Sequence, residues 1–562
     1  MTESSAAALS AEISRETMMR HLQEFAKRVK LSGTKEELES FQYLQRCMDS
    51  YGFRTELLSH DAYISLPGKA RAEVDGQTVP CITHSFSRPS PAGGLSAALV
   101  YLGDGSDQAF AAKDVRGKIV LVEGIANPAV SARAAAAGAV GQVHISPNEN
   151  RYEMCVSPVW GSPSHELLEN LPKTVVCSLS NPDGSAIRDR LAKGEQPKIV
   201  LHAEVDTGWR KTPILVAEMM PPGAAADVPY VLFSGHHDTW YYGVMDNGSA
   251  NTTMLEASRV LAQHCAQWRR GLRVCFWSGH SHGRYSGSAW YADEHWDDLE
   301  RRCIVHVNVD STGGIGADDM TASTVSSEMA ALARETVEAV TGQIHAGKRS
   351  SRSSDASFWG IGIPSMFGSL SMQPQGVEKM RNALGWWWHT PHDTIDKIDP
   401  ANLVRDTDVF VRTLWRLLTD RVLPIDQAAQ VQTLLTALQD IGASTRKPVS
   451  LSAVIEAAES LRGKAATARQ RAEAGSDGDA DRVNQAMLRV ARALVPLDYT
   501  AGDRFAHDPA LPHPAWPALE GLRGPDATTE DALFSAVAAR RTRNRVLHAL
   551  RQAHAALDAA LA

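Results

Sequence analysis

The sequence lacks any apolar run near the ~18 residues that a membrane-spanning helix needs. Its N-terminus also lacks the basic start and apolar core of an export signal, so we expect neither a membrane anchor nor an export signal. Basic residues are not in excess, since the formal net charge is -8 and the pI is near 6.2. This charge balance argues against a nucleic-acid partner, which would need a strongly basic surface.

Cysteine is scarce, and the seven cysteines include no CxxC pair. Their number is odd, and most of them lie in apolar segments. This pattern favours reduced thiols in the core over a disulfide framework, which is typical of cytoplasmic proteins. We therefore expect a cytoplasmic protein whose cysteines are free.

The length of 562 residues exceeds a single ordinary core, so we expect several domains. Apolar residues at helical spacing predict an opening pair of helices over residues 13–30 and 35–51. A change of texture near Gly68, followed by short valine-rich runs, predicts a compact β-rich insert that ends near Asp206. From Pro213 onwards strands alternate with amphipathic helices, which is the pattern of an α/β sheet.

The part of the chain after Leu423 reads as almost wholly helical. The predicted helices cover residues 427–439, 451–474, 480–494 and 529–561, with a proline-rich irregular stretch before the last one. Such helices need a partner surface. We expect them to pack on the α/β region and on a second copy of the chain, as a homodimer.

Imidazole and carboxylate groups follow several strand-like runs of the α/β region. The run that ends in Phe233 leads into SGHHDTWYYGVMDNGSAN, and the run over residues 273–277 leads into SGHSH. Asp310 ends a third run, and a loop with the sequence HTPHD begins at His389. Because open sheets build ligand sites at the carboxyl ends of their strands, we expect these groups to meet in one metal site.

His236, Asp246 and Asp310 supply one three-ligand set for a transition metal such as Zn²⁺. A carboxylate can bridge two ions, so Asp246 could be shared between them. Asp238, two residues beyond His236, suits an acceptor that fixes the imidazole tautomer. The alternative is that Asp238 and Asp246 cap the helix that follows.

The sequence resembles the co-catalytic zinc aminopeptidase family, in its branch with glutamate carboxypeptidase and the transferrin receptor. His236 and Asp246, ten residues apart, match the first metal histidine and the bridging aspartate of that branch. Asp310 matches the strand-end aspartate, and His389 matches the histidine that completes the second metal. The segment 353–364 also fits the part of the family that precedes a late strand.

The resemblance implies an α/β fold with a mixed-sheet, aminopeptidase-like zinc-peptidase domain, formed by residues 1–67 and 207–423. It also implies an inserted β-rich protease-associated domain over residues 68–206 and a helical dimerisation domain over residues 424–562. The implied cofactor is zinc, as one or two divalent ions, and manganese or iron would also be compatible with these ligands.

The sequence departs from the family at its catalytic glutamates. Family members carry two consecutive glutamates after a strand that ends in tryptophan, the first as general base and the second as metal ligand. After Trp277 this chain has His280 and Ser281 at those positions. His280 and His282 are two residues apart, so on an extended segment both would point to one side and could reach a metal.

Three outcomes are compatible with this departure. In the first, His282 or His280 supplies the missing ligand beside Asp246 and His389, and two-metal chemistry remains available. In the second, His280 stays off the metal and acts as a general base or acid. In the third, only His236, Asp246 and Asp310 bind, and a single ion with open positions polarises a carbonyl or a water.

The substrate side of the site also differs. Trp388 stands where the carboxypeptidase branch has a tyrosine that stabilises the tetrahedral intermediate. Either another side chain replaces that tyrosine, or the reaction differs. The candidates for replacement are Tyr241, Tyr242, Arg284 and Tyr285. Trp388 could form an aromatic wall for a small ligand or pack a loop against the sheet. Arg352 and Arg381 could hold a substrate carboxylate, or be ordinary ion-pair arginines.

The sequence therefore predicts a metallohydrolase of an amide or related C–N bond in a small amino-acid-derived or peptide-like substrate, with metal-bound water as nucleophile. The predicted catalytic residues are His280 and Asp238, and the predicted substrate-binding residues are Trp388, Arg352 and Tyr285. A catalytically inactive dimeric binding protein of the transferrin-receptor type is one alternative. A metalloenzyme that performs elimination or cyclisation on the same fold is another.

Overall fold

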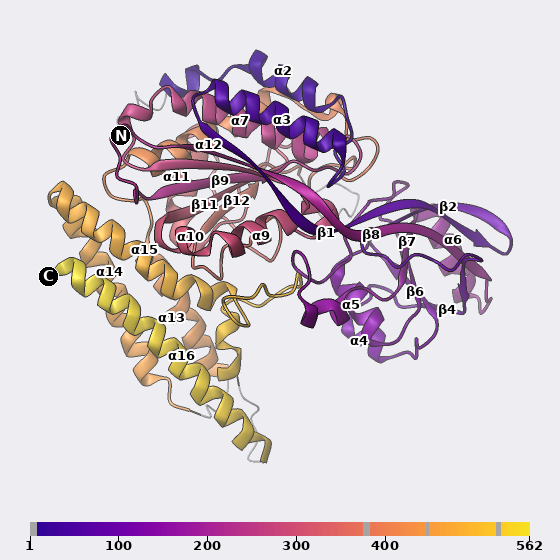
Figure 1. The fold of residues 1–562 in the computed structure, drawn as a ribbon. Helices are drawn as coiled ribbons and strands as arrows, with labels where there is room; N and C mark the ends of the chain where they lie inside the picture. Colours follow the sequence, from indigo (N-terminus) through magenta and orange to yellow (C-terminus); the bar gives the residue numbers. More distant parts are fainter. Residues whose placement is uncertain (1–7, 375–382, 445–448, 524–529) are drawn as a thin grey trace.

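The computed structural model describes residues 8–374, 383–444, 449–523 and 530–562. Figure 1 shows three parts: an α/β region, a smaller unit joined to it by a long two-stranded ribbon, and a group of long helices that ends at the C-terminus. No helix of these described ranges is both long and apolar enough to cross a bilayer. All seven cysteines lie in the described ranges and are free thiols.

The opening pair of helices is α2 (Arg15–Phe25) and α3 (Lys35–Ser50). Each begins at a hydroxyl side chain that accepts a main-chain N–H of the first turn, Ser14 from Thr17 and Thr34 from Glu37. The predicted pair is therefore present, with the first helix shorter than its apolar pattern suggested.

The ribbon consists of β1 (Arg54–Val74) and β8 (Ile199–Met219), which pair antiparallel over almost their full length of 21 residues each. A register shift between Pro67 and Ala70 marks the point where the ribbon leaves the α/β region. Both strands continue through the predicted domain limits at residues 67 and 206. The inserted unit is thus tied to the α/β region by continuous strands.

The inserted unit holds a second set of strands, three α-helices and a short 3-10 helix, His165–Asn170. Its strands β4, β5, β6 and β7 pair parallel in that order, and β2 pairs antiparallel with β7. The unit therefore contains α/β-type pairing as well as the expected strands. Its elements are β2 (Gln77–Thr83), β3 (Leu95–Ala97), β4 (Leu99–Tyr101), α4 (Asp107–Ala111), β5 (Ile119–Glu123), α5 (Pro128–Ala136), β6 (Gly141–Ile145), β7 (Val175–Leu179) and α6 (Asn181–Ala192).

The α/β region is built on four parallel strands, β9 (Tyr230–His236), β10 (Gly271–Trp277), β11 (Cys303–Asp310) and β12 (Ser365–Ser369). Their spatial order is β12-β11-β9-β10, and β10 pairs antiparallel with β8, so the sheet is mixed. β9, β10 and β11 are buried at every residue, as expected for strands covered on both faces.

Helices cover both faces of this sheet. Figure 1 shows α2, α3 and α7 (Ala250–Ala262) on one side, and α9 (Ser286–Glu294) and α10 (Trp296–Arg302) on the other. Two further long helices, α11 (Ala330–Thr341) and α12 (Pro400–Thr419), complete the layer that holds α7. This is the α/β fold that the sequence predicts.

The C-terminal part contains four long helices, α13 (Gln427–Ser444), α14 (Ser452–Ala474), α15 (Asp477–Tyr499) and α16 (Glu530–Leu561). A capping box of Ser476 and Asp479 starts α15. The apolar residues of these helices join the same hydrophobic cluster as those of α7 and α12. The helical region is therefore packed on the α/β region, as predicted.

Candidate metal centre

The predicted ligands meet because parallel strands end at the same edge of the sheet. β9 ends at His236, the neighbouring β11 ends at Asp310, and β10, on the other side of β9, leads through a short turn to His280. Ligand atoms of His236, His280 and Asp310 all lie within 4.8 Å of one another. This is a three-ligand set of two imidazoles and one carboxylate.

His236 is oriented by a main-chain carbonyl. Its Nδ1 lies 2.9 Å from the carbonyl oxygen of Asp238, which can only accept, so Nδ1 carries the hydrogen and Nε2 presents a lone pair. Nε2 lies 3.1 Å from Oδ1 of Asp246 and 3.9 Å from Oδ1 of Asp310. Both Nε2 of His236 and Oδ1 of Asp246 are buried without a hydrogen-bond partner. A proton or a cation is needed between them.

The pKa of His236 also indicates that a positive charge is favoured at this site. Burial alone would lower the pKa of His236, but Asp246, with smaller contributions from Asp310 and Asp238, raises that pKa to about 10. The surroundings of Nε2 therefore favour positive charge at this place. A divalent ion would supply this positive charge, and it could bind the lone pairs of Nε2 of His236 and Oδ1 of Asp246 at the same time.

Asp246 faces two imidazoles at once. Its Oδ2 lies 3.0 Å from Nε2 of His389, while Oδ1 faces His236. The main-chain N–H groups of Met245 and Asp246 both donate to the buried carboxyl of Asp393, at 2.8 and 3.0 Å, and this fixes the turn that carries Asp246. A carboxylate held between two imidazoles in this way suits a bridging or proton-sharing role.

His389 is oriented by the inserted unit. Its Nδ1 donates to the carbonyl oxygen of Glu153 at 2.6 Å, so its Nε2 also presents a lone pair to Asp246. The N–H of Glu153 donates back to the carbonyl of His389 at 3.1 Å. Trp388, predicted to bind substrate, lies stacked on the imidazole of His389 with ring centroids 3.4 Å apart and is 9% exposed. It therefore packs the ligand loop and shields His389 from water.

His280 lies on the side of the site that holds His236. The two rings are stacked with centroids 3.7 Å apart, and Nδ1 of His280 lies 2.7 Å from Oδ2 of Asp355. This contact leaves Nε2 of His280 available to an ion. The hypothesis that placed His280 beside Asp246 and His389 is not what the structure shows, because its ring nitrogen is grouped with His236 and Asp310.

His282 lies apart from this group. The structure forms a helical turn, α8 (His280–Gly283), in place of the extended segment on which the prediction for His280 and His282 depended. Residues two apart on a helix point about 200° away from each other, so His280 and His282 do not share a side. Nδ1 of His282 faces the hydroxyl of Ser32 at 3.0 Å, and its ring packs on Trp240. Burial lowers the pKa of His282.

Asp238 acts through two different groups. Its carbonyl oxygen, rather than its carboxylate, orients His236. The carboxylate instead accepts the main-chain N–H groups of His280 at 3.1 Å and Ser281 at 2.8 Å, and the hydroxyl of Ser32 at 2.8 Å. The buried carboxylate therefore holds the α8 turn in place, and it does not face the three-ligand group directly.

The other predicted substrate-binding residues are largely enclosed. Tyr285 is 7% exposed and meets the ring of His280 edge-on at 4.7 Å. Arg352 stacks on Trp160 at 4.0 Å and donates to the carbonyl of Asp508 at 2.5 Å. Its guanidinium therefore joins the inserted unit to the C-terminal part, and is not directed at the imidazoles. Arg381 lies outside the described residues.

Several residues around the site were not assigned a role from the sequence. Asp355 and Asp393 are buried carboxyls that reach the site from later loops, and Glu153 acts through its carbonyl oxygen. Two of them had a signal in the sequence: Asp393 ends the same HTPHD motif as His389, and Asp355 lies in the segment 353–364 that fits the family. The contacts of Glu153 and Asp355 depend on long-range packing that no local motif encodes.

The residues present fit a divalent transition metal. Two imidazoles and a carboxylate are the ligand types that Zn²⁺ accepts, and a carboxylate from Asp246 lies beside them. Each imidazole has its second nitrogen bonded to a carbonyl or carboxylate, as metal-bound histidines usually have. On the His389 side, the described residues offer no further group of three ligand atoms beside the one above.

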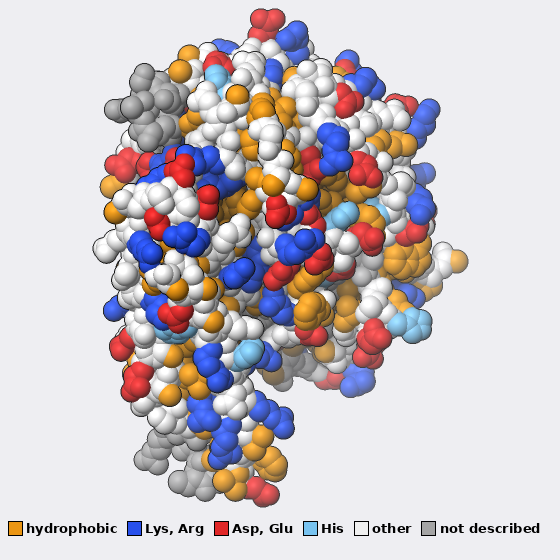
Figure 2. Space-filling model, turned by 60° about the vertical axis from the view of Figure 1, so that its left-hand side comes forward, with side chains coloured by type: hydrophobic (Ala, Val, Ile, Leu, Met, Phe, Trp, Pro, Cys, Tyr) orange, Lys and Arg blue, Asp and Glu red, His pale blue; other side chains and the backbone are white. Residues whose placement is uncertain are grey.

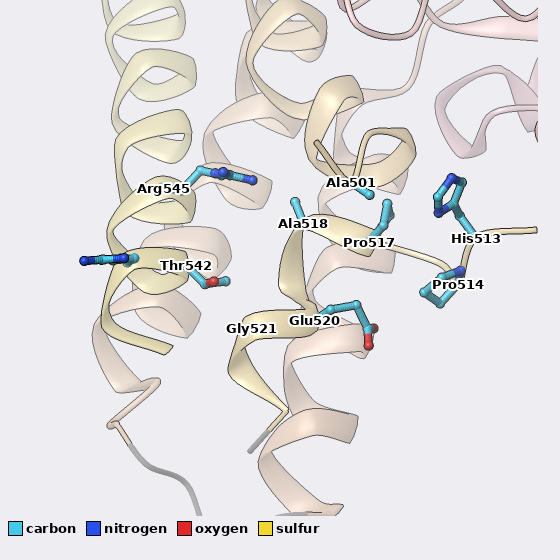
Figure 3. Close-up of a pocket in the computed structure, with 10 residues that line it drawn as sticks. Ala501, His513, Pro514, Pro517, Ala518, Glu520, Gly521, Thr542 and Arg545 are labelled. Carbon is cyan, nitrogen blue, oxygen red and sulfur yellow. The ribbon is translucent and has the colours of Figure 1, made fainter. Parts of the chain in front are cut away.

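A separate pocket in the C-terminal part holds none of these residues. Figure 3 shows it between α16 and the short helix Pro517–Leu522, with Arg545 on one wall and Pro514, Pro517 and Glu520 on the other. Its volume is about 330 Å³. The metal centre is therefore located by its ligands and not by this cavity.

Comparison with known proteins agrees with this site. Residues 215–414, which include all the candidate ligands, match the model of peptidase family M28. A probable glutamate carboxypeptidase, AMP1 of Arabidopsis thaliana, is 22% identical over 358 residues, and the match covers 52% of this chain and 51% of that protein. The chain thus spans about half the length of this relative. A probable glutamate carboxypeptidase of Zea mays, VP8, is 30% identical over 91 residues, or 16% of this chain and 13% of that protein.

Solved structures show the same fold. An aminopeptidase from Aneurinibacillus has a TM-score of 0.57 at 20% identity, covering 74% of this chain and 96% of that one. A peptidase M28 precursor from Shewanella amazonensis has a TM-score of 0.60 at 19% identity, covering 75% of this chain and 97% of that one. With the matched region, the ligand positions and this fold in agreement, residues 215–414 form a domain of peptidase family M28, the co-catalytic zinc peptidase family.

Proposed function

We propose that the protein is a metal-dependent hydrolase of an amide or related C–N bond in a small amino-acid-derived or peptide-like substrate. The observation that carries this proposal is the convergence of His236, His280 and Asp310 within 4.8 Å at the carboxyl edge of the sheet. An inactive relative would have no need to keep these ligands together with their orienting partners. The family match and the fold support the same reading.

His236, His280 and Asp310 would hold one ion, with Asp246 beside them. When bound, a divalent ion such as zinc supplies Lewis acidity to a substrate carbonyl and to an attacking water. The chain's own groups do the rest. Asp238 and Asp355 fix the two imidazoles in the tautomer that presents Nε2 to the site, and Trp388 keeps water from His389.

Asp246 and His389 would bind and transfer a proton. Their facing atoms, Oδ2 and Nε2, lie 3.0 Å apart, and Nδ1 of His389 already donates to Glu153. If no second ion lies there, the contact needs a proton between Oδ2 and Nε2. A proton shared there would be available to the leaving nitrogen, so the pair would take over the general acid–base work of the family's first glutamate.

The experiment combines metal analysis with hydrolysis. The purified chain is treated with a chelator, its zinc or manganese is restored, and a panel of dipeptides and N-acyl amino acids is assayed with each form. We expect restored hydrolysis only in the presence of the ion. The same assay is run on His389→Ala. His392→Ala is its matched control, because His392 lies on the same loop as His389 but is exposed.

Two results would overturn the proposal. A chain that retains no ion even in excess zinc or manganese would favour a binding protein of the transferrin-receptor type. A chain that binds the ion but cleaves no member of the panel would favour elimination or cyclisation over hydrolysis. Neither alternative is favoured by a specific feature of the described structure.

We also propose that the protein forms a homodimer through its C-terminal helices. The first turns of α16 expose Leu533, Phe534 and Val537, which are 70%, 67% and 44% exposed. In Figure 2, hydrophobic side chains are visible at the lower end of the helical region, while acidic and basic side chains are interspersed over the rest of that face. An apolar group at the start of a long helix is a suitable contact for a second copy.

A further inference from the structure

A buried carboxylate stands directly behind His280. Oδ2 of Asp355 lies 2.7 Å from Nδ1 of His280, and Asp355 is 1% exposed. Asp355 and Ser354 both have φ in the left-handed region, at 57° and 47°. Aspartate tolerates this conformation better than most residues, but serine adopts it only where the surrounding structure holds it there. The position of this carboxylate is therefore imposed by its surroundings.

The second oxygen of Asp355 is held by a chain of hydroxyl groups. Oδ1 lies 2.8 Å from the hydroxyl of Ser288, which lies 2.9 Å from the hydroxyl of Ser357. The Ser357 hydroxyl accepts the indole N–H of Trp160 at 2.9 Å. The donors can all point one way, from Trp160 through the two serines to Asp355. Trp160 belongs to the inserted unit, so this chain links the unit to His280.

The contact between Asp355 and His280 affects how His280 binds the ion. Because the carboxylate accepts the Nδ1 hydrogen, His280 presents the lone pair of Nε2, and the imidazole becomes a stronger ligand. The contact also fixes the rotation of the ring that lies stacked on His236. Without Asp355, Nδ1 would lose its acceptor and the ring could turn away from His236 and Asp310.

We propose that Asp355 is the positioning residue that makes His280 a metal ligand, and that Trp160 sets the place of Asp355 through Ser357 and Ser288. This inference rests on the proposed metal site, and it adds the inserted unit as a determinant of metal affinity. It assigns the role of metal ligand to His280 and the role of its orienting partner to a carboxylate from a separate loop.

The test is a double-mutant cycle read by metal affinity. Zinc affinity is measured by competition with a chromophoric chelator for wild type, Asp355→Ala, His280→Ala and the double variant, with Co²⁺ absorption spectra as a second readout. We expect Asp355→Ala to weaken zinc binding by about 10–100-fold in the wild-type background. In the His280→Ala background it should cause no further loss, because the residue it positions is gone.

A conservative variant guards against misfolding. Asp355→Asn keeps the shape and one oxygen that can accept the Nδ1 hydrogen, so it should retain most of the affinity that Asp355→Ala loses. Trp160→Phe keeps the ring but removes the N–H, and should weaken binding less than Asp355→Ala does. Trp209→Phe, which changes an indole that is 59% exposed on the ribbon, is its matched control.

The outcomes separate this inference from the proposed function. Wild type that binds neither zinc nor cobalt would refute the proposed function. Wild type that binds zinc with Asp355→Ala binding it equally well would overturn only the role of Asp355. Equal losses in both backgrounds would show a purely structural role and overturn it too. Trp160→Phe that behaves like Trp209→Phe would remove the link to the inserted unit.

Discussion

Oδ2 of Asp246 lies 3.0 Å from Nε2 of His389, yet neither atom has a hydrogen to give when His389 is neutral. Nδ1 of His389 carries its hydrogen and donates it to Glu153. The contact therefore requires either a proton or a second ion. Since the described residues offer only one group of three ligand atoms, on the His280 side, a proton is the expected occupant.

This relationship predicts the number of bound ions. We expect one zinc per chain in wild type and in His389→Ala, and less than about 0.1 in His236→Ala, because loss of a ligand costs more than the 10–100-fold typical of orienting residues. Elemental analysis after gel filtration measures this ratio. Two ions in wild type and one in His389→Ala would instead establish a two-ion centre that includes His389.

A pH effect on stability is expected at the contact between the α/β region and α13. Glu328 is fully buried and accepts from Ser327 and Gln430, each at 3.3 Å. Burial raises the pKa of Glu328 to about 8, from 4.5 when exposed. The folded state thus binds a proton that the unfolded state loses. The stability from this proton is fully present below about pH 4.5 and is lost as the pH rises to about 8.

Replacing this carboxyl should remove the effect. Glu328→Gln cannot ionise. Its amide N–H can donate to Oε1 of Gln430, which is unpaired, once the terminal amide of Gln430 flips. We expect the variant to be more stable than wild type at pH 8.5, by roughly 4–5 kcal/mol, and similar to it at pH 4.5. Thermal melts at the two pH values test this. A constant difference across the range would show that Glu328 does not titrate there.

The sequence predicted the strand-end ligands because of a property of parallel strands. His236 and Asp310 each end a largely apolar run, and neighbouring parallel strands bring such ends together whatever the loops do. Asp246 was expected from the same ligand types and His389 from its HTPHD loop, and the resemblance to a family gave each its role. The structure places Asp246 against His236, and His389 against the other oxygen of Asp246. The predicted helices of the C-terminal part followed from their spacing in the same direct way.

The choice between His280 and His282 could not be made from the sequence. It depends on whether residues 280–283 are extended or helical, and a four-residue turn carries no periodic pattern. The turn is held by the carboxylate of Asp238, which accepts two of its N–H groups. That contact joins residues more than 40 positions apart, so no local sequence pattern indicates it.

The long ribbon escaped prediction for a similar reason. β1 and β8 contain Pro67 and Pro213, which normally interrupt strands, and their polar residues alternate only in part. Pairing with each other over 21 residues decides their conformation. The insert was recognised from its composition, but the strands that carry it cross the limits drawn at residues 67 and 206.

Arg352 gives a prediction that separates substrate binding from structure. Its guanidinium lies between Trp160 and the carbonyl of Asp508, and burial lowers its pKa to about 10. We expect Arg352→Ala to destabilise the protein by roughly 2–4 kcal/mol, since it removes a partly buried hydrogen bond and a cation–π contact. KM for cleaved substrates should change less than about threefold, a free-energy change under 0.7 kcal/mol. A tenfold rise in KM with an unchanged melting temperature would instead return Arg352 to the substrate site.

The exposed start of α16 predicts how the protein associates. Leu533 and Phe534 expose about two thirds of their surface, which is unfavourable unless a partner covers them. We expect a dimer mass in light scattering for wild type, and a monomer for the double variant Leu533→Asp and Phe534→Asp, because two buried carboxylates would oppose the contact. Ile344→Asp is the matched control, since Ile344 is 65% exposed but lies outside the C-terminal helices. If the double variant remains a dimer at the same concentration as the control, the contact lies elsewhere on the molecule.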